Sequence, residues 1–92
     1  MIRKKFVINA KYGVHLRPAV RIYEAIKDSR SKVEIKKDDN VVDARSTLGI
    51  ITLNILPGDT IEIIVNGPDE QEVIERLTNL IEYQRLGEED DN

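Results

Sequence analysis

The sequence contains one histidine, His15, in a short segment that also holds a glycine, an arginine and a proline. Pro18 fits only near the start of a helix, because proline lacks the N–H that interior helical positions donate. This places His15 at or next to the N-cap, where the first-turn N–H groups lack acceptors and the helix dipole is positive. Phosphate binds well at such an end, and neutral imidazole is a nucleophile near neutral pH. The segment therefore predicts a histidine that accepts a phosphoryl group.

Arg17 lies two residues after His15 and can offer a planar pair of cationic donors to the same phosphate oxygens. The backbone N–H groups of Leu16 and Arg17 are further expected donors. A phosphohistidine hydrolyses readily and so keeps a high transfer potential. The expected chemistry is therefore to accept a phosphoryl group, hold it and pass it on.

Hydrophobic periodicity predicts the elements that position this segment. Alternation with a period of two indicates strands over residues 2–8, 32–37, 41–42 and 60–65. Spacings of three and four predict a helix over residues 16–27, with a buried stripe of Leu16, Ala19, Val20, Tyr23 and Ile26. A last helix begins at residues 67–70, with Pro68 early and acidic residues near the positive end of the helix dipole. Its predicted buried stripe is Val73, Leu77, Leu80 and Ile81.

A short apolar stretch after Ser46 suits either a buried strand or a short helix. Ser46-Thr47 as a capping pair and Asn54 as a left-handed end favour the helix. The order is then strand, helix, strand, strand, helix, strand, helix. This order predicts one α+β domain in two layers, with the helices on one face of a single sheet.

The 92 residues suffice for one small domain, with 40% hydrophobic and 34% charged residues. No apolar run approaches the roughly 20 residues that span a bilayer, and the first residues lack the apolar core of a signal peptide, so we expect a cytoplasmic protein. With no cysteine and one histidine, we expect no metal site, and without a phosphate-binding glycine loop we expect no nucleotide or other cofactor.

Residues 88–92 form an acidic tail, expected to be disordered, after a domain of residues 1–87. Of the 17 acidic residues, four lie in this tail, which leaves 13 acids against 14 bases in the domain. The bases are not clustered with the four aromatic residues. We therefore expect neither nucleic-acid binding nor membrane insertion.

Several segments resemble the HPr family, the histidine phosphocarriers of the bacterial phosphotransferase system for sugar uptake. The resemblance covers about residues 2–86 and implies an open-faced β-sandwich of βαββαβα order, with a four-stranded antiparallel sheet covered on one face by three helices. It implies that a monomer takes phosphate on Nδ1 of His15 from phosphorylated enzyme I and gives it to enzyme IIA proteins. The matching segments are Gly13-Val14-His15-Leu16-Arg17-Pro18-Ala19, Ala44-Arg45-Ser46-Thr47-Leu48-Gly49-Ile50, Pro57-Gly58-Asp59-Thr60-Ile61 and Asn66-Gly67-Pro68-Asp69-Glu70.

The same resemblance implies that Ser46 is phosphorylated by an HPr kinase/phosphorylase. The added charge would repel acidic partners from a docking face, so inhibition is the expected result. The docking residues expected on that face are Leu16, Val20, Thr47, Leu48 and Ile51. The sequence departs from the family pattern in large apolar residues at 16 and 20, a polar Thr47 and a bulky Tyr12 before the histidine segment.

Three alternatives stay open beside the phosphocarrier. The first is a regulatory relative in an incomplete system, which signals through phosphorylation of His15 or Ser46 without sugar transport. The second is a small ligand- or RNA-binding module, for which neither a basic sheet face nor an aromatic platform is evident. The third, a stand-alone enzyme, is the weakest, because no acid–base partner can be named.

Overall fold

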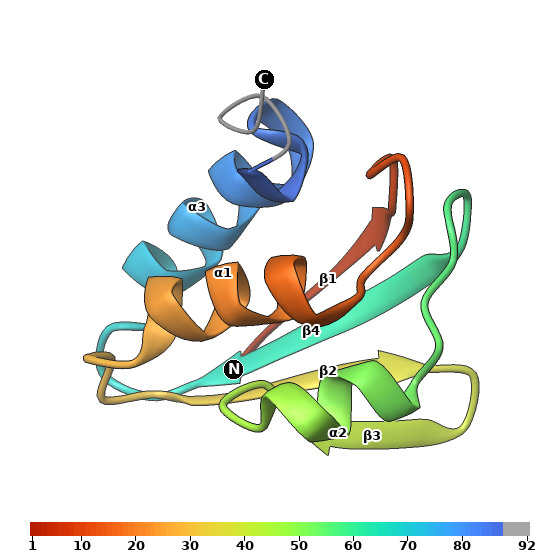
Figure 1. Ribbon diagram of the computed structural model, residues 1–92. Helices are drawn as coiled ribbons and strands as arrows, with labels where there is room; N and C mark the ends of the chain where they lie inside the picture. The colour runs from red at the N-terminus through yellow and green to blue at the C-terminus, as the bar shows by residue number, and fades with distance from the viewer. Residues whose placement is uncertain (88–92) are drawn as a thin grey trace.

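The computed structural model describes residues 1–87 of the chain, and a four-stranded antiparallel sheet forms its base (Figure 1). The strands are β1 (Ile2–Val7), β2 (Lys32–Lys37), β3 (Asn40–Asp43) and β4 (Thr60–Asn66), in the order β1-β4-β2-β3. β4 lies in the centre and pairs with both β1 and β2. The predicted acidic tail, residues 88–92, lies outside the described residues.

Three helices lie on one side of this sheet (Figure 1). They are α1 (Leu16–Ile26), α2 (Thr47–Thr52) and α3 (Glu70–Thr78), and a π-helical turn, η1 (Asn79–Tyr83), continues α3. Pro68 precedes Asp69, the N-cap of α3, instead of lying within the first turn. The βαββαβα order confirms the predicted α+β fold, an open-faced sandwich with helices on one face.

The core fills the space between the helices and one face of the sheet. Alternate residues of the central strands point into it, and the opposite sheet face carries charged residues. The predicted stripe of α3 and η1 is buried throughout. The inward residues are Phe6, Val33, Ile35, Ile61, Ile63 and Val65 from the strands, with Ala19, Ile22, Ile26, Val73, Leu77, Leu80 and Ile81 from the helices.

The predicted buried stripe of α1 was only partly right. Ala19 and Ile26 are fully buried, but Leu16, Val20 and Tyr23 are 59%, 37% and 39% exposed. The helix meets the sheet along Ala19, Ile22 and Ile26, at spacings of three and four. The other apolar residues form a second stripe, rotated around the helix and turned towards solvent, so periodicity alone merged two faces into one.

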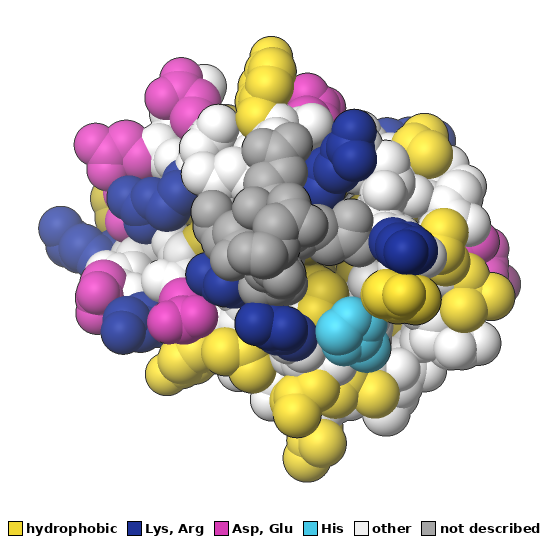
Figure 2. Space-filling view, turned by 45° about the horizontal axis from the view of Figure 1, so that its top comes forward, with side chains coloured by type: hydrophobic (Ala, Val, Ile, Leu, Met, Phe, Trp, Pro, Cys, Tyr) yellow, Lys and Arg dark blue, Asp and Glu magenta, His cyan; other side chains and the backbone are white. Residues whose placement is uncertain are grey.

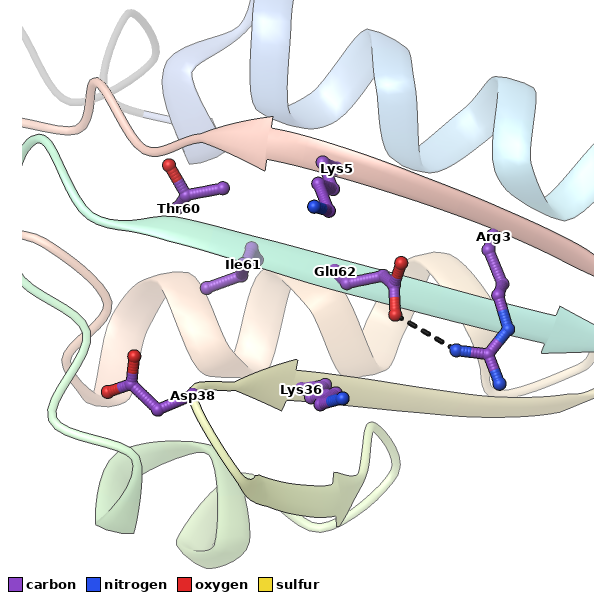
Figure 3. A pocket seen from close by; sticks show the side chains of 7 residues that line it. All are labelled: Arg3, Lys5, Lys36, Asp38, Thr60, Ile61 and Glu62. Carbon is purple, nitrogen blue, oxygen red and sulfur yellow. Dashed lines mark hydrogen bonds and ion pairs between the residues drawn. The ribbon is translucent and has the colours of Figure 1, made fainter.

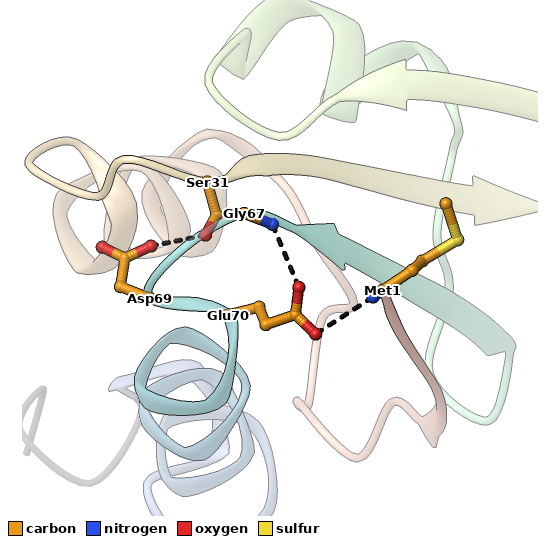
Figure 4. A network of polar contacts seen from close by, with 5 residues as sticks. All are labelled: Met1, Ser31, Gly67, Asp69 and Glu70. Atoms are coloured by element: carbon orange, nitrogen blue, oxygen red, sulfur yellow. Dashed lines mark hydrogen bonds and ion pairs between the residues drawn. The ribbon is translucent and has the colours of Figure 1, made fainter.

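A cluster of hydrogen bonds ties the start of α3 to the loop between α1 and β2 (Figure 4). The Asp69 carboxylate accepts from the hydroxyl of Ser31, from the Arg30 N–H at 3.0 Å and from the Ser29 hydroxyl at 3.0 Å. These donors, Ser31 first, lower the pKa of Asp69 from 3.8 to about 2. Beside them, Glu70 accepts from the Gly67 N–H and pairs with the terminal ammonium of Met1 at 3.0 Å.

Arg45 ties a third segment to the same loop. Its guanidinium donates to the carbonyls of Ile26, Ser29 and Ser31 at 2.7–3.0 Å. The carbonyl of Ile26, the last residue of α1, thereby gains a cationic donor, which also complements the negative end of the helix dipole. Within residues 1–87 no helix has the length and apolarity that crossing a membrane requires.

The Asp69 cluster predicts an acid-sensitive stability. Because the pKa of Asp69 is lower in the folded than in the unfolded state, its stabilisation is present above about pH 4 and is lost as the pH falls towards 2. We expect Asp69→Asn to lower the midpoint of urea unfolding at pH 6. Between pH 4 and 2 this midpoint should fall less steeply in the variant than in the wild type. The control is Asp39→Asn in the exposed β2–β3 turn, which should keep the wild-type profile; equal profiles for both variants would contradict this assignment.

Candidate functional site

His15 is the N-cap of α1, as predicted, and its side chain is exposed. Its backbone is extended (φ −93°, ψ −163°), its carbonyl accepts from the Ala19 N–H at 3.1 Å, and its imidazole makes no capping hydrogen bond to the helix. No acidic residue lies in the first turn. The ring therefore stands at the positive end of α1, where no carboxylate of that turn competes with an incoming anion.

A surface hollow runs from His15 along the exposed side of α1. It brings together His15, Arg17 and the apolar Leu16 and Val20, as the sequence predicted, and adds Arg21 and Glu24. Figure 2 shows the histidine with Lys/Arg side chains beside it and hydrophobic side chains around it. Arg21 was not identified from the sequence. Its spacing of four from Arg17 could have indicated it, because residues four apart lie on the same face of a helix.

The loop before His15 is fixed by a contact with the segment that follows α2. Gly13 has φ +72°, and a Cβ built there would overlap the carbonyl oxygen of Ile55. The next residue, Val14, is buried and donates its N–H to that same oxygen at 2.9 Å. Only glycine satisfies both the left-handed backbone and this close approach, so the packing of the loop sets where α1 and His15 begin.

The Ile55 segment is in turn fixed by an ion pair. Lys37, at the end of β2, lies 2.9 Å from the Asp59 carboxylate and donates to the Asn54 carbonyl at 2.7 Å. Asp59 also accepts the Leu56 N–H at 2.8 Å. This backbone hydrogen bond and Lys37 lower the pKa of Asp59. The carboxylate is therefore charged at neutral pH and holds both sides of the turn that carries Ile55.

Tyr12 lies beside His15, an arrangement that the sequence did not predict. The centroids of the Tyr12 and His15 rings are 6.5 Å apart with an angle of 65° between the planes, an edge-on arrangement. The ammonium of Lys11 lies 5.3 Å from the centroid of the Tyr12 ring. The bulky residue before the histidine segment thus lies edge-on to the imidazole.

The predicted docking residues all lie on α1 and α2, which pack against each other. Leu48 is the most exposed of them at 74%. Thr47 and Ile51 are half-buried, and Ile51 packs against the core. The two helices therefore present apolar side chains to solvent from adjacent elements, with His15 at one end.

Ser46 is the N-cap of α2, as predicted. Its Oγ accepts the Gly49 N–H at 3.0 Å, and its carbonyl accepts the Ile50 N–H at 3.0 Å. Asn54, after the helix, has φ +50°, which confirms the predicted left-handed end. The Ser46 side chain is exposed, so its hydroxyl is both a structural cap and accessible from solvent.

Another hollow lies on the charged face of the sheet (Figure 3). Arg3, Lys5 and Lys36 surround Glu62, and the Arg3 guanidinium donates to Glu62 at 3.0 Å. With Asp38, the lining has three cations against two carboxylates, and it contains no histidine or cysteine. No group of three or more histidine, cysteine or acidic side chains within residues 1–87 could hold a metal ion.

Comparisons with known proteins agree with this geometry. A family model described as "PTS HPr component phosphorylation site" matches residues 2–83. The HPr-like protein Crh of Halalkalibacterium halodurans is 37% identical over 91% of this chain and 100% of its own length. The phosphocarrier protein HPr of Cupriavidus necator is 32% identical over 96% of this chain and 98% of its own length.

Solved structures share the fold. HPr-C-His from Thermoanaerobacter tengcongensis superposes with a TM-score of 0.89 at 33% identity, covering 96% of this chain and 98% of that one. An HPr dimer from the same organism matches with a TM-score of 0.72 at 32% identity, over 92% and 98% of the two chains.

The approach of Gly13 to Ile55 predicts a large cost for any side chain at position 13. A left-handed alanine costs about 1–2 kcal/mol, and overlap with the Ile55 carbonyl raises the expected loss in Gly13→Ala to about 2–4 kcal/mol of unfolding free energy. The control is Gly58→Ala, where φ is +90° but no atom lies within 4 Å of the new Cβ, so only the conformational cost applies. Urea denaturation measures both, and equal losses would show that the close approach is unimportant.

Proposed function

Because this chain belongs to the HPr family, whose members carry phosphoryl groups and are not themselves enzymes, we propose that His15 takes a phosphoryl group from phosphorylated enzyme I and passes it to enzyme IIA proteins. The observation that carries the proposal is the exposed imidazole at the positive end of α1, in the same hollow as Arg17. Because exchange with enzyme I and enzyme IIA takes place in the cytoplasm, the proposed location of this protein is the cytoplasm. A single chain, with β1 paired to its own β4, suffices for this task, so we propose a monomer.

The transfer step needs little from this chain beyond position and charge. Nδ1 of neutral His15 attacks phosphorus as the bond from phosphorus to the donor breaks, and the imidazole proton stays on Nε2. The phosphoryl oxygens then meet the first-turn N–H groups and the Arg17 guanidinium. In the second transfer a nucleophile of enzyme IIA attacks phosphorus, the bond between phosphorus and Nδ1 breaks, and the imidazole returns to its starting state.

A regulatory role is the second candidate. The similarity to a Crh protein, at 37% identity, favours a protein that signals its phosphorylation state. The presence of His15 in a hollow with Arg17 favours a carrier. Phosphoryl transfer onward from His15 to an enzyme IIA protein separates the two, because a purely regulatory protein does not need that second step.

Ser46 is proposed as the regulatory site, modified by an HPr kinase/phosphorylase. Its hydroxyl is accessible, and it opens α2, the helix that carries Thr47, Leu48 and Ile51 of the proposed docking surface. A phosphate there adds about two negative charges beside apolar side chains that a partner would cover. Desolvating these charges, or bringing them against an acidic partner, weakens docking without touching His15.

His15 and Arg17 can be tested in one assay. Incubation with phosphoenolpyruvate and enzyme I should give an acid-labile, base-stable phosphate that His15→Ala abolishes. Arg17→Ala should slow transfer about 10- to 100-fold, since a charge-assisted hydrogen bond contributes about 1.5–3 kcal/mol. Label that persists in His15→Ala, or no label in the wild type, would overturn the carrier proposal.

Ser46 variants separate its charge from its cap. Aspartate and asparagine both replace serine as an N-cap, so Ser46→Asp and Ser46→Asn should retain stability, whereas Ser46→Ala should lose about 1 kcal/mol. Only Ser46→Asp should raise the KM for enzyme I, and the rise should shrink at high salt. An acid-stable phosphate from ATP and the kinase, absent in Ser46→Ala, tests the modification; an equal KM for the aspartate and asparagine variants would contradict inhibition by charge.

A further inference from the structure

The Tyr12 ring meets the His15 ring edge-on, with centroids 6.5 Å apart. We propose that Tyr12 is a positioning residue for His15, which holds the imidazole in one orientation at the amino end of α1. The inference rests on the proposed function, because it concerns the transfer that His15 performs. It gives a role to Tyr12, whose bulk beside the histidine segment had no explanation from the sequence.

The backbone fixes the points from which both rings extend. The Gly13 N–H bonds to the Ala10 carbonyl at 3.0 Å and closes a tight turn that contains Tyr12. Ala10 and Val14, on either side of this turn, are 0% and 4% exposed. Both ends of the turn are thus held in the core, so the backbone of Tyr12, whose side chain is 69% exposed, cannot move far from that of His15 without unpacking one of these residues.

The imidazole needs such a support. An exposed histidine without a capping hydrogen bond can occupy several staggered rotamers. Within residues 1–87, Tyr12 is the aromatic ring that contacts it. Edge-to-face pairs shift such populations by about two- to tenfold, which is enough to make one rotamer dominate.

Lys11 supports the Tyr12 ring in turn. Its ammonium lies 5.3 Å from the ring centroid, within the range of a cation–π contact. This contact and the closed turn restrict the Tyr12 ring, so that its edge-on contact with His15 persists. Tyr12 neither gives nor takes a proton in the transfer, so its ring and not its hydroxyl carries the effect.

The consequence for the reaction is orientation. Transfer requires Nδ1 to lie in line with the bond that breaks between phosphorus and its donor, and any time spent in other rotamers lowers the rate. Loss of the ring should therefore lower the rate constant at saturating partner. Docking, which uses the exposed apolar residues of α1 and α2, should be unchanged.

The first test uses the unphosphorylated protein and its variants. Nuclear Overhauser effects between the ring protons of Tyr12 and His15 should be present in the wild type and in Tyr12→Phe. The His15 ring-proton shifts should change in Tyr12→Ser but not in Tyr12→Phe. The control is Tyr83→Ser, because Tyr83 is equally exposed, at 69%, and lies on η1.

The second test measures transfer from phosphorylated enzyme I under saturating and limiting conditions. Tyr12→Ser should lower kcat about two- to tenfold with an unchanged KM, and Tyr12→Phe should restore it. Absence of the ring-to-ring signal in the wild type, a normal kcat in Tyr12→Ser, or an equal defect in Tyr12→Phe would each overturn the proposal. These failures differ from failure of the carrier function, in which the wild type itself takes no phosphate at His15.

Discussion

The carbonyl oxygen of Ile55 is the point on which the site depends. It accepts the Val14 N–H at 2.9 Å, and the missing side chain of Gly13 lets the loop approach it. One atom thus joins the loop before α1 to the turn after α2, although about 40 residues separate them in the chain. Because His15, the N-cap of α1, lies two residues after Gly13, this contact decides where the helix dipole and the backbone of His15 and Tyr12 lie.

The support for this atom comes from the sheet. Lys37 ends β2, and its bonds to Asp59 and to the Asn54 carbonyl fix the turn in which Ile55 lies. The sheet therefore positions the Lys37–Asp59 ion pair, the ion pair positions the Ile55 carbonyl, and this carbonyl positions the loop that carries His15. An exposed histidine in an open hollow depends on such support, because its position is set by the backbone that carries it.

The sequence predicted what is local and missed what is distant. The N-cap at Ser46, the left-handed Asn54 and His15 at the start of α1 all follow from residues within a few positions of each other. The contact between Gly13 and Ile55 has no such signature, because it joins two loops far apart in the chain. The burial of α1 failed for a related reason: Leu16 and Val20 are as apolar as the core residues, and only the position of the sheet decides which stripe faces inward.

That second apolar stripe explains how so simple a site can work. In the free chain, water surrounds His15 and Arg17 and weakens the attraction of any phosphate to the guanidinium. A partner that covers Leu16, Val20 and Leu48 would bury apolar surface and exclude this water, which strengthens the same attraction at the moment of transfer. Once the partner leaves, water returns and the site loses that advantage. The exposed side of α1 would thus make transfer depend on docking, and a charge at Ser46, at the start of the adjacent helix, would act on docking alone.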